Sequence, residues 1–484
     1  MSQEPASELH QRITPVIHLA GSSSSSTSDD DEHSSSLPIF ELPEFSVKEL
    51  LSAIPAHCFH RSALRSSLYL LWDIFLSVSF IYLATFIDPY FNTLTSINPA
   101  LVGLARFAAW AFYGYAIGLV WTGQFHFLSK ASSKVIYEKT NTPSELISLS
   151  GIWVIAHECG HQAFSSSKTI NNTVGLVLHS FLLVPYHSWR ISHAQHHAAT
   201  CHLTRDQVFV PKTRSARGLP ALPENASKRE RDGALPSSLY EKMDDLLEDA
   251  PFWNFLNLAL QQLVGWLLYM TMNASGQPRY PSWTNHFNPN AIIFDARHRS
   301  QVTNSVIGIG LMLTALTVMG IKTDFMTVFK YYIVPYFHVN HWLVMITFLQ
   351  HTDPLIPHYR DGAFNFQRGA LCTIDRNIHS FFFHGIAETH VAHHLCSKIP
   401  HYNAWDATAA IKEKLGKHYH QTDENAWLSL WKVYNQCRFV EDEGDVVFWK
   451  NAKGQAARRL GSPGSKGSVS DSGVEINDVS TTQN

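Results

Sequence analysis

The sequence predicts an all-α integral membrane protein, with four transmembrane helices in two hairpins and a cytosolic helical cap that carries three histidine motifs. Two observations support this fold class: long apolar segments in the middle of the chain, and histidines at helical spacings outside those segments. Each segment has about 20 residues, roughly what a helix needs to cross the hydrocarbon core. The four segments are residues 68–87, 101–122, 302–321 and 331–349. Core helices of a large soluble protein are the alternative, but four such segments in one chain favour membrane spans.

The distribution of basic residues predicts the orientation of the first hairpin. The connection at residues 88–100 contains no Lys or Arg, whereas basic residues precede the first span and follow the second. These residues are Lys48, Arg61, Arg65, Lys130, Lys134 and Lys139. The positive-inside rule therefore places the N-terminus in the cytosol and residues 88–100 in the lumen. The connection at residues 322–330 is short, so the third and fourth spans form a second hairpin.

A fifth apolar segment, residues 252–272, is interpreted as an interfacial helix rather than a span. Its Trp253 and Trp266 suit the headgroup region of a membrane. If the segment crossed the membrane, the third histidine motif would lie in the lumen, apart from the first two. With four crossings, both termini and all three motifs face the cytosol.

Composition limits the other classes of function. A net charge of −3 gives no indication of nucleic-acid binding. The six cysteines are scattered without a CxxC pair, which supports neither a disulfide framework nor an iron–sulfur site. Residues 1–36 and 451–484 are polar and rich in Ser, and we expect both tails to be disordered because they cannot bury enough apolar surface. Residues 37–450 then form the membrane domain.

Histidine is the residue type that stands out, with 28 copies in 484 residues. The motifs HECGH, HAQHH and HVAHH contain spacings of three and four residues, which place side chains on one face of a helix. An HxxHH pattern is expected by chance only about 0.1 times in such a chain, so two of them indicate a functional cluster. The motif histidines are His157, His161, His193, His196, His197, His390, His393 and His394.

This set of imidazoles exceeds the needs of one tetrahedral zinc ion and suits two metal ions, for which iron is a good candidate. HECGH also fits the HExxH pattern of zinc metalloproteases, with Glu158 as general base, but a protease would leave the other two motifs unused. A bundle with carboxylate-bound iron needs a second ExxH motif, which the core of the chain lacks. A histidine-rich metal transporter would place its histidines inside the spans.

The motifs and their surroundings resemble the membrane fatty acid desaturase family, and within it the fungal microsomal oleate (Δ12) desaturases. The similar stretches around the motifs are GIWVIAHECGHQAF, HSWRISHAQHH and GIAETHVAHHLCSKIPHYNAWDA. FELPEFSVKELLSAIPAHCF, TRDQVFVPKTR, NASGQ, NHFNP and VNHWLVMITFLQHTDP match as well. Together these stretches cover most of residues 40–450 in the order that the family shows.

The resemblance implies an oxygen-dependent oxidoreductase with two iron ions, held by the motif histidines and by a ninth ligand, His351. Inserting a double bond removes hydrogen from unactivated methylenes, which requires O2 activated at a metal and electrons from outside. The implied substrate is a fatty acyl chain linked to phospholipid or CoA, and the implied reaction is Δ12 desaturation of oleate to linoleate. An ω-3 or bifunctional Δ12/Δ15 desaturase and a fatty acyl hydroxylase are the alternatives within the family.

The resemblance also implies a place in the endoplasmic reticulum membrane, with the active site in the cytosol. The implied electron donor is NADH, acting through separate cytochrome b5 and cytochrome b5 reductase, because the chain contains no HPGG haem-binding sequence of a fused cytochrome b5 domain. Three acidic residues beside the motifs, Glu158, Asp353 and Glu388, are expected to orient the histidine rings.

The sequence departs from the family at residues 124–150. Relatives run from the second span almost directly into the first histidine motif, whereas here this segment separates Gly123 from Ile152. We expect an insertion, such as a translated intron, whose two ends lie close together. A genuine cytosolic loop over the cap is the alternative, because long surface loops are tolerated at modest entropic cost.

Overall fold

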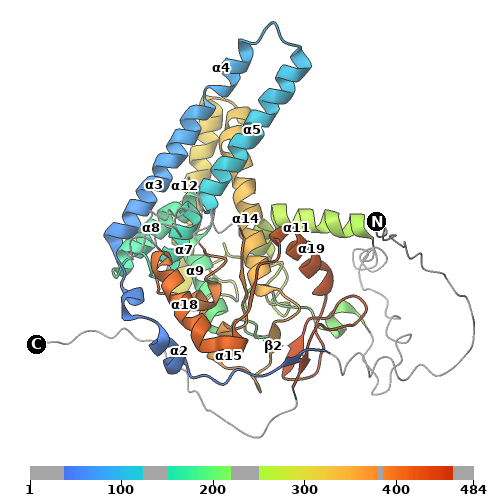
Figure 1. Ribbon diagram of the computed structural model, residues 1–484. Coiled ribbons are helices and arrows are strands. Elements are labelled where there is room, and N and C mark those ends of the chain that lie inside the picture. Colours follow the sequence, from blue (N-terminus) through green and yellow to red (C-terminus); the bar gives the residue numbers. More distant parts are fainter. Residues whose placement is uncertain (1–36, 124–150, 220–249, 379–384, 462–484) are drawn as a thin grey trace, which may run out of the picture.

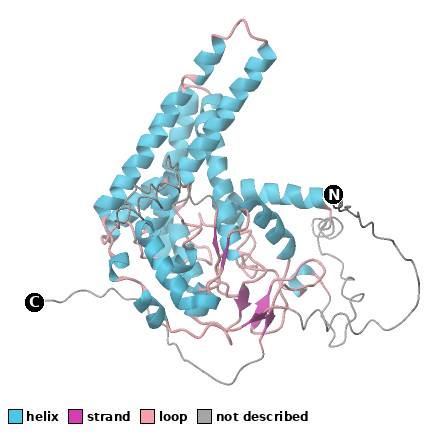
Figure 2. Cartoon of the chain, viewed as in Figure 1, coloured by secondary structure: helices cyan, strands magenta, loops and turns pink. Residues whose placement is uncertain are grey.

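The structure is a computed structural model that describes residues 37–123, 151–219, 250–378 and 385–461. The described chain is mostly helical and contains three short two-stranded sheets (Figure 2). Long helices rise as a stem from a broader cap in which shorter helices and the sheets are gathered (Figure 1). This arrangement confirms the predicted all-α class, and the strands are a small addition to it.

The stem consists of the two predicted hairpins. The first contains α3 (Ala63–Ala84), α4 (Ile87–Asn92) and α5 (Pro99–Thr122). The second contains α12 (Arg299–Lys322), α13 (Phe325–Val328), the π-helical turn η4 (Phe329–Ile333) and α14 (Val334–His351). The starts of α3 and α5 follow from local sequence, because the side chains of Ser62 and Asn98 accept hydrogen bonds from backbone N–H groups of the first helical turns.

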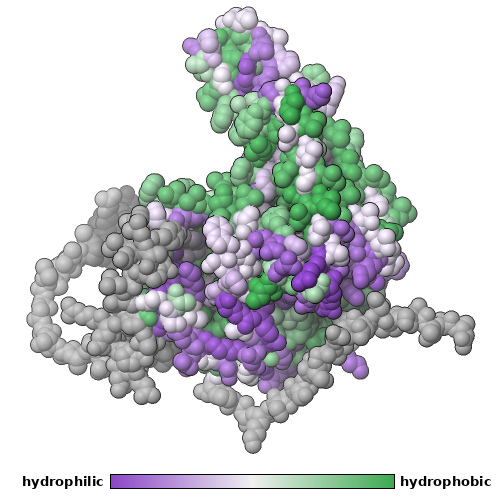
Figure 3. Space-filling model, turned by 180° about the vertical axis from the view of Figure 1, so that it is seen from behind, coloured by the Kyte–Doolittle hydropathy of each residue, from purple (hydrophilic) through white to green (hydrophobic). Residues whose placement is uncertain are grey.

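The face of the stem seen in Figure 3 is largely apolar, with hydrophilic residues toward its tip. Leu71, Phe75, Phe107 and Leu311 are each more than half exposed, as is typical of side chains that contact lipid. Among the described residues, four helical stretches are long and apolar enough to cross a membrane. They are Ala63–Asn92, Pro99–Thr122, Pro251–Met272 and Ala296–Lys322. The chain is an integral membrane protein.

Helices α11 (Pro251–Met272) and α14 differ in how they are placed relative to the stem. Length and hydropathy select α11 and not α14, although the sequence analysis assigns a span to residues 331–349 and an interfacial position to 252–272. In Figure 1, α14 rises into the stem while α11 extends to one side from its base, and the assignment of the spans stays a prediction. Trp266 differs from expectation: it is 8% exposed and belongs to the hydrophobic core, so its ring is not available to headgroups.

The two hairpins approach closely where α5 meets α14. A Cβ atom added at Gly118 would lie 2.4 Å from the Cβ of His338, and one at Gly114 would lie 2.6 Å from Cγ1 of Val334. Only glycine leaves room for the backbones at this distance, as at other helix contacts in membranes. Toward the far end of the stem, Lys330 Nζ lies 2.7 Å from a carboxylate oxygen of Asp88 and links the hairpins again.

The cap is built from shorter helices and from strands contributed by distant parts of the chain (Figures 1 and 2). Its α-helices are α2 (Val47–Ala53), α7 (Ile152–Gly160), α8 (Lys168–Phe181), α9 (Tyr186–Ala198), α15 (Phe366–Ala370), α17 (His390–Leu395), α18 (Ala404–Leu415) and α19 (Ala426–Gln436). The paired strands are β1 (Ile39–Phe40) with β6 (Arg459–Leu460), β2 (Pro357–Tyr359) with β5 (Val446–Phe448), and β3 (Asp375–Arg376) with β4 (Gln421–Thr422). The β2–β5 pair is antiparallel, and the other two pairs are parallel.

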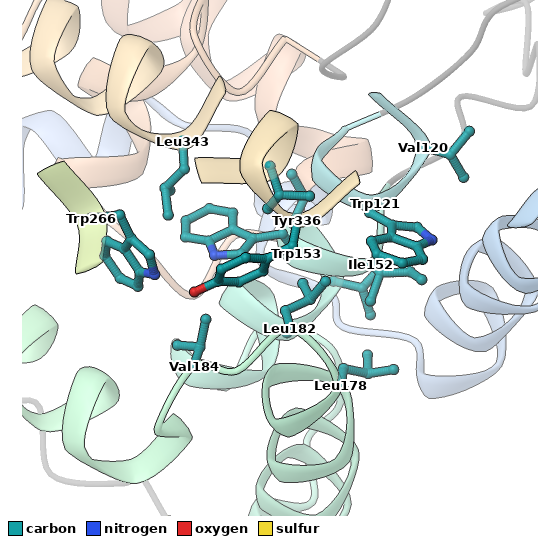
Figure 4. Packing of buried hydrophobic residues seen from close by; sticks show 14 of the residues in the cluster. Val120, Trp121, Ile152, Trp153, Leu178, Leu182, Val184, Trp266, Tyr336 and Leu343 are labelled. Carbon is teal, nitrogen blue, oxygen red and sulfur yellow. The ribbon is translucent and has the colours of Figure 1, made fainter. Parts of the chain in front are cut away.

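The first hairpin joins the cap where α5 ends and α7 begins. A Cβ atom added at Gly151 would lie 2.3 Å from the carbonyl oxygen of Gly123, so the two ends of the 124–150 segment are in contact. Trp121 of α5 and Trp153 of α7 belong to one buried cluster here (Figure 4). The two ends lie close together as expected, but residues 124–150 themselves lie outside the described residues, and the insertion stays a prediction.

The chain ends give one correction. Residues 1–36 and 462–484 lie outside the described part of the chain, but residues 451–461, predicted to begin a disordered tail, are placed. The backbone N–H groups of Arg459 and Gly461 donate hydrogen bonds to the carbonyls of Pro38 and Phe40 at 3.1 and 2.9 Å. The polar sequence of this segment does not predict a strand, but pairing with the N-terminal strand provides backbone hydrogen bonds that hold it in place. The pairing brings both described ends of the chain together on the cap.

Candidate metal centre

Four helices bring the nine predicted ligands together in the centre of the cap. Helix α7 supplies the first motif, α9 the second and α17 the third, while α14 ends at His351. The structure sorts seven of the nine into two groups that could each hold a metal ion. His157, His161, His193 and His393 form the first group, and His196, His351 and His394 form the second. Each group therefore draws on at least three separate stretches of the chain.

In the first group, one ring nitrogen from each histidine lies within 4.8 Å of the others. The Nε2 atoms of His157 and His193 are 3.2 Å apart, and the Nε2 of His197 is also 3.2 Å from that of His193. The Nε2 atoms of His161 and His393 are buried and have no hydrogen-bond partner in the described structure. Imidazole nitrogens that converge in this way can act together as ligands of one metal ion.

The second group is equally compact. The Nε2 atoms of His196 and His351 are 3.3 Å apart, and His390 joins the group with its Nε2 2.9 Å from His351 and 3.1 Å from His394. The ring of His197 stacks on that of His394 with centroids 4.0 Å apart, so it lies between the two groups. All nine predicted ligands therefore gather around two neighbouring centres.

Burial favours the neutral, metal-binding form of several of these rings. Removal from water, reinforced by neighbouring imidazoles, holds the pKa values of His157, His161 and His197 well below the usual range. The same causes lower the pKa of His393 to about 3. Neutral imidazole is the ligating form, and the donor set of nitrogen atoms alone suits iron or zinc. The residues present thus fit two metal ions.

Asp206 is a buried acid that the sequence analysis did not select. Its Oδ1 lies 2.6 Å from Nδ1 of His196, which directs the other ring nitrogen toward the second group. Asp206 is itself fixed, because the backbone N–H groups of Cys201 and Gln207 donate hydrogen bonds to its two oxygens at 2.7 and 2.6 Å. The stretch TRDQVFVP was noted for its resemblance, but no helical spacing connects Asp206 to the second motif.

Two of the three acids predicted to orient the histidine rings contact residues other than the proposed ligands. Glu158 accepts a hydrogen bond at 2.9 Å from the backbone N–H of His401, and Asp353 pairs with the guanidinium of Arg376. Glu388 lies in the turn before α17. A short carboxylate contact with a proposed ligand is found at Asp206, and the role of the three predicted acids stays a prediction.

Helix α9 is held in place by residues far along the chain. His286 of the NHFNP stretch lies with its Nε2 3.0 Å from Ser192 Oγ, directly before His193. Gln195 donates a hydrogen bond from Nε2 to the carbonyl of Ile293 at 3.1 Å. These bonds fix the helix close to its ligating residues, and one of them comes from the NHFNP stretch.

A largely apolar cavity of about 680 Å³ adjoins the histidines. His193, His196 and His351 form one part of its wall, next to the indole rings of Trp153 and Trp189. Helices α11 and α14 supply more than half of the other lining residues, and most of these are apolar. Its volume lies within the range of about 300–1,000 Å³ that is common for ligand pockets. The cavity can hold a long apolar group against both groups of histidines.

Comparison with known proteins decides the family. The family model named "Fatty acid desaturase" matches residues 146–425, more than half of the chain. The chain belongs to the fatty acid desaturase family. A Delta(12) fatty acid desaturase of Mortierella alpina is 46% identical over 424 residues, which cover 86% of this chain and 94% of that protein. A Delta(12)-fatty-acid desaturase of Arabidopsis thaliana is 40% identical, over 85% of this chain and 93% of its own length.

An oleate hydroxylase of Claviceps purpurea is also similar, at 37% identity over 85% of this chain and 82% of that protein. Membership of the desaturase family makes the chain an oxidoreductase and removes the zinc protease alternative. The geometry agrees, because Glu158 is bound to His401 and points its carboxylate there, while His157 and His161 share their group with histidines of the other two motifs.

Proposed function

We propose that this desaturase inserts a Δ12 double bond into an oleoyl chain and holds two iron ions on its nine clustered histidines. Two compact groups of imidazoles beside an apolar cavity support this proposal most strongly. The names of the two relatives described above support the position of the double bond.

The iron ions would supply the activation of O2, so that one O2, two electrons and two protons accept the two hydrogens of a methylene pair and leave as two waters. The protein contributes the placement. His193, His196 and His351 are both cavity wall and proposed ligands, so a methylene chain in the cavity passes beside the centre. The rings of Trp153 and Trp189 exclude water from the same wall, which protects the reacting carbons from side reactions.

The electrons are proposed to come from NADH through cytochrome b5 and its reductase, which would approach the cap. We further propose that the chain lies in the endoplasmic reticulum membrane with the cap in the cytosol. In this topology α3, α5, α12 and α14 span the bilayer and α11 lies in the interface. Support comes from α11, which extends to one side from the base of the stem, and from the absence of basic residues between α4 and α5.

Expression in a yeast that makes only monounsaturated fatty acids tests the proposal. We expect linoleate to accumulate in membrane lipids at the expense of oleate. A hydroxylated oleate product would instead indicate a hydroxylase. Oleate hydroxylation is the alternative to consider because the similar protein of Claviceps purpurea is an oleate hydroxylase. A second culture supplied with linoleate separates an ω-3 or bifunctional activity, which would produce a third double bond. Membranes depleted of cytochrome b5 should lose turnover; undiminished turnover there would contradict the proposed electron donor.

A further inference from the structure

Helix α19 carries an exposed apolar stripe at the edge of the cap. Trp427, Leu428 and Trp431 are 50%, 64% and 37% exposed, although they are large and apolar. The opposite face of the helix is buried and packs against α14 and α11. These two tryptophans and one leucine lie on consecutive turns and form an exposed apolar patch. Such a patch is typical of a surface that contacts a membrane or another molecule.

Contacts place this stripe near the spans of the stem. The ring of Trp427 stacks on His341 with centroids 5.4 Å apart, and it meets Trp342 edge-on at 6.2 Å. Trp342 in turn contacts Tyr115 of α5 at 6.1 Å. Tyr115 lies in the second predicted span and is 39% exposed on the stem surface. The stripe of α19 is thus close to the apolar surface that faces lipid.

Helix α19 is also fixed to the start of α11. Asn254 Nδ2 donates a hydrogen bond to Asn435 Oδ1 at 2.9 Å, and Arg438 donates one to Asn254 Oδ1 at the same distance. Near this junction α11 exposes Phe252 and Phe255, which are 77% and 62% accessible. The two helices therefore present their exposed apolar side chains as neighbouring parts of one surface.

This surface adjoins the open side of the cavity. Leu260 and Leu268 of α11 line the cavity and yet are 49% and 38% exposed, so the wall continues to the outside along α11. Tyr434 of α19 lines the cavity as well. Tryptophan is favoured at the membrane–water boundary, where its ring is apolar and its N–H reaches polar groups. Lys432, paired with Glu424 at 2.9 Å, lies beside the stripe and suits the polar side of that boundary.

We propose that α19 lies in the lipid interface beside α11, and that the two helices frame the mouth through which an acyl chain passes from the bilayer into the cavity. The occupant of the apolar surface is lipid, because the surface lies beside the lipid-facing stem. The second half of the proposal rests on the proposed function, whereas the position of α19 does not.

Nitroxide labelling of Leu428→Cys in phosphatidylcholine bilayers tests the position of α19. Glu413→Cys on α18, an exposed polar site in the cap, is the control, and the parent chain with its native cysteines sets the background. We expect the collision rate with O2, relative to that with a water-soluble nickel complex, to be several-fold higher at residue 428. Equal ratios at both sites would overturn the proposal. Exclusion of both reagents at residue 428 would also overturn it, because a protein partner or a second copy would then cover the stripe.

Substitution at the mouth tests the path. Leu268→Trp adds bulk where the cavity opens, whereas Leu263→Trp adds it to an exposed site of α11 outside the cavity wall. We expect several-fold slower turnover of an oleoyl phospholipid for Leu268→Trp only, with unchanged iron content in both variants. Equal turnover in the two variants would refute the path. A parent chain that makes no double bond would contradict the proposed function and leave the labelling result standing.

Discussion

The stem and the cap place their side chains in opposite ways, although α14 belongs to both. Leu71 of the stem is 60% exposed, whereas His196 of the cap is 1% exposed. Lipid accepts the apolar side chains of the stem, and close backbone contact holds its helices together. The cap instead buries imidazoles and an acid, which is costly unless they bind one another or a metal. Substitutions of the buried polar residues in the cap should therefore reduce catalytic activity, and substitutions at the helix contacts of the stem should reduce the amount of folded protein.

His196→Ala should have the largest effect on activity. It tests whether a ligand in the cap can be lost without loss of folded protein. The second group loses a proposed ligand, so we expect no detectable dienoic product in the yeast assay. The protein should remain in the membrane at near-parental levels, as judged by quantitative immunoblotting of the membrane fraction. His60→Ala, at an exposed histidine of the cap, is the control and should retain activity. A His196→Ala variant with most of the parental activity would show that this histidine is structural.

Asp206→Asn tests the acid that holds the ring of His196. The substitution keeps the shape of the side chain but removes the carboxylate that holds His196. We expect metal affinity to fall by about 10- to 100-fold, measured as iron retained against chelators of graded strength. The matched control is Asp361→Asn, because Asp361 contacts His202 at 3.0 Å but is 83% exposed. Equal iron retention by both variants would show that Asp206 does not contribute to metal binding.

Gly118→Val tests the stem. The added Cβ would lie 2.4 Å from that of His338, so the hairpins must separate or shift, at a cost of about 1–3 kcal/mol. We expect a lower thermal midpoint in detergent and less monodisperse protein, with the iron per folded chain unchanged. Gly103→Val is the control, since nothing lies within 4 Å of a Cβ at Gly103. If both variants behave alike, close packing at Gly118 does not hold the stem.

Deletion of residues 124–150 tests the junction of stem and cap and should have the smallest effect. Gly123 and Gly151 are already in contact, so their direct connection requires little movement of α5 or α7. We expect desaturase activity equal to or above that of the full chain in the yeast assay. A deletion variant that folds but has lost activity would show that the segment is a working part of the enzyme. Sequencing of the mature transcript establishes independently whether these codons are retained.

The stem and the histidine motifs could be predicted because their signals are local. An apolar run marks a span, and spacings of three and four place His193, His196 and His197 on one helix. Asp206 could not be found in this way, since its contact with His196 depends on a loop that returns to α9. The strand at Arg459–Leu460 was missed for the same reason, because its partner lies more than 400 residues earlier in the chain. The division of the ligands into two groups likewise depends on how four helices meet.

The metal content of the purified chain shows whether the clustered histidines hold two iron ions. We expect two iron ions per chain and negligible zinc, measured by mass spectrometry of protein purified in detergent without added metal. Chelation should remove the iron and the activity together, and iron should restore both. One zinc ion per chain, or full activity in iron-free protein, would contradict the claim that the clustered histidines form a two-iron centre.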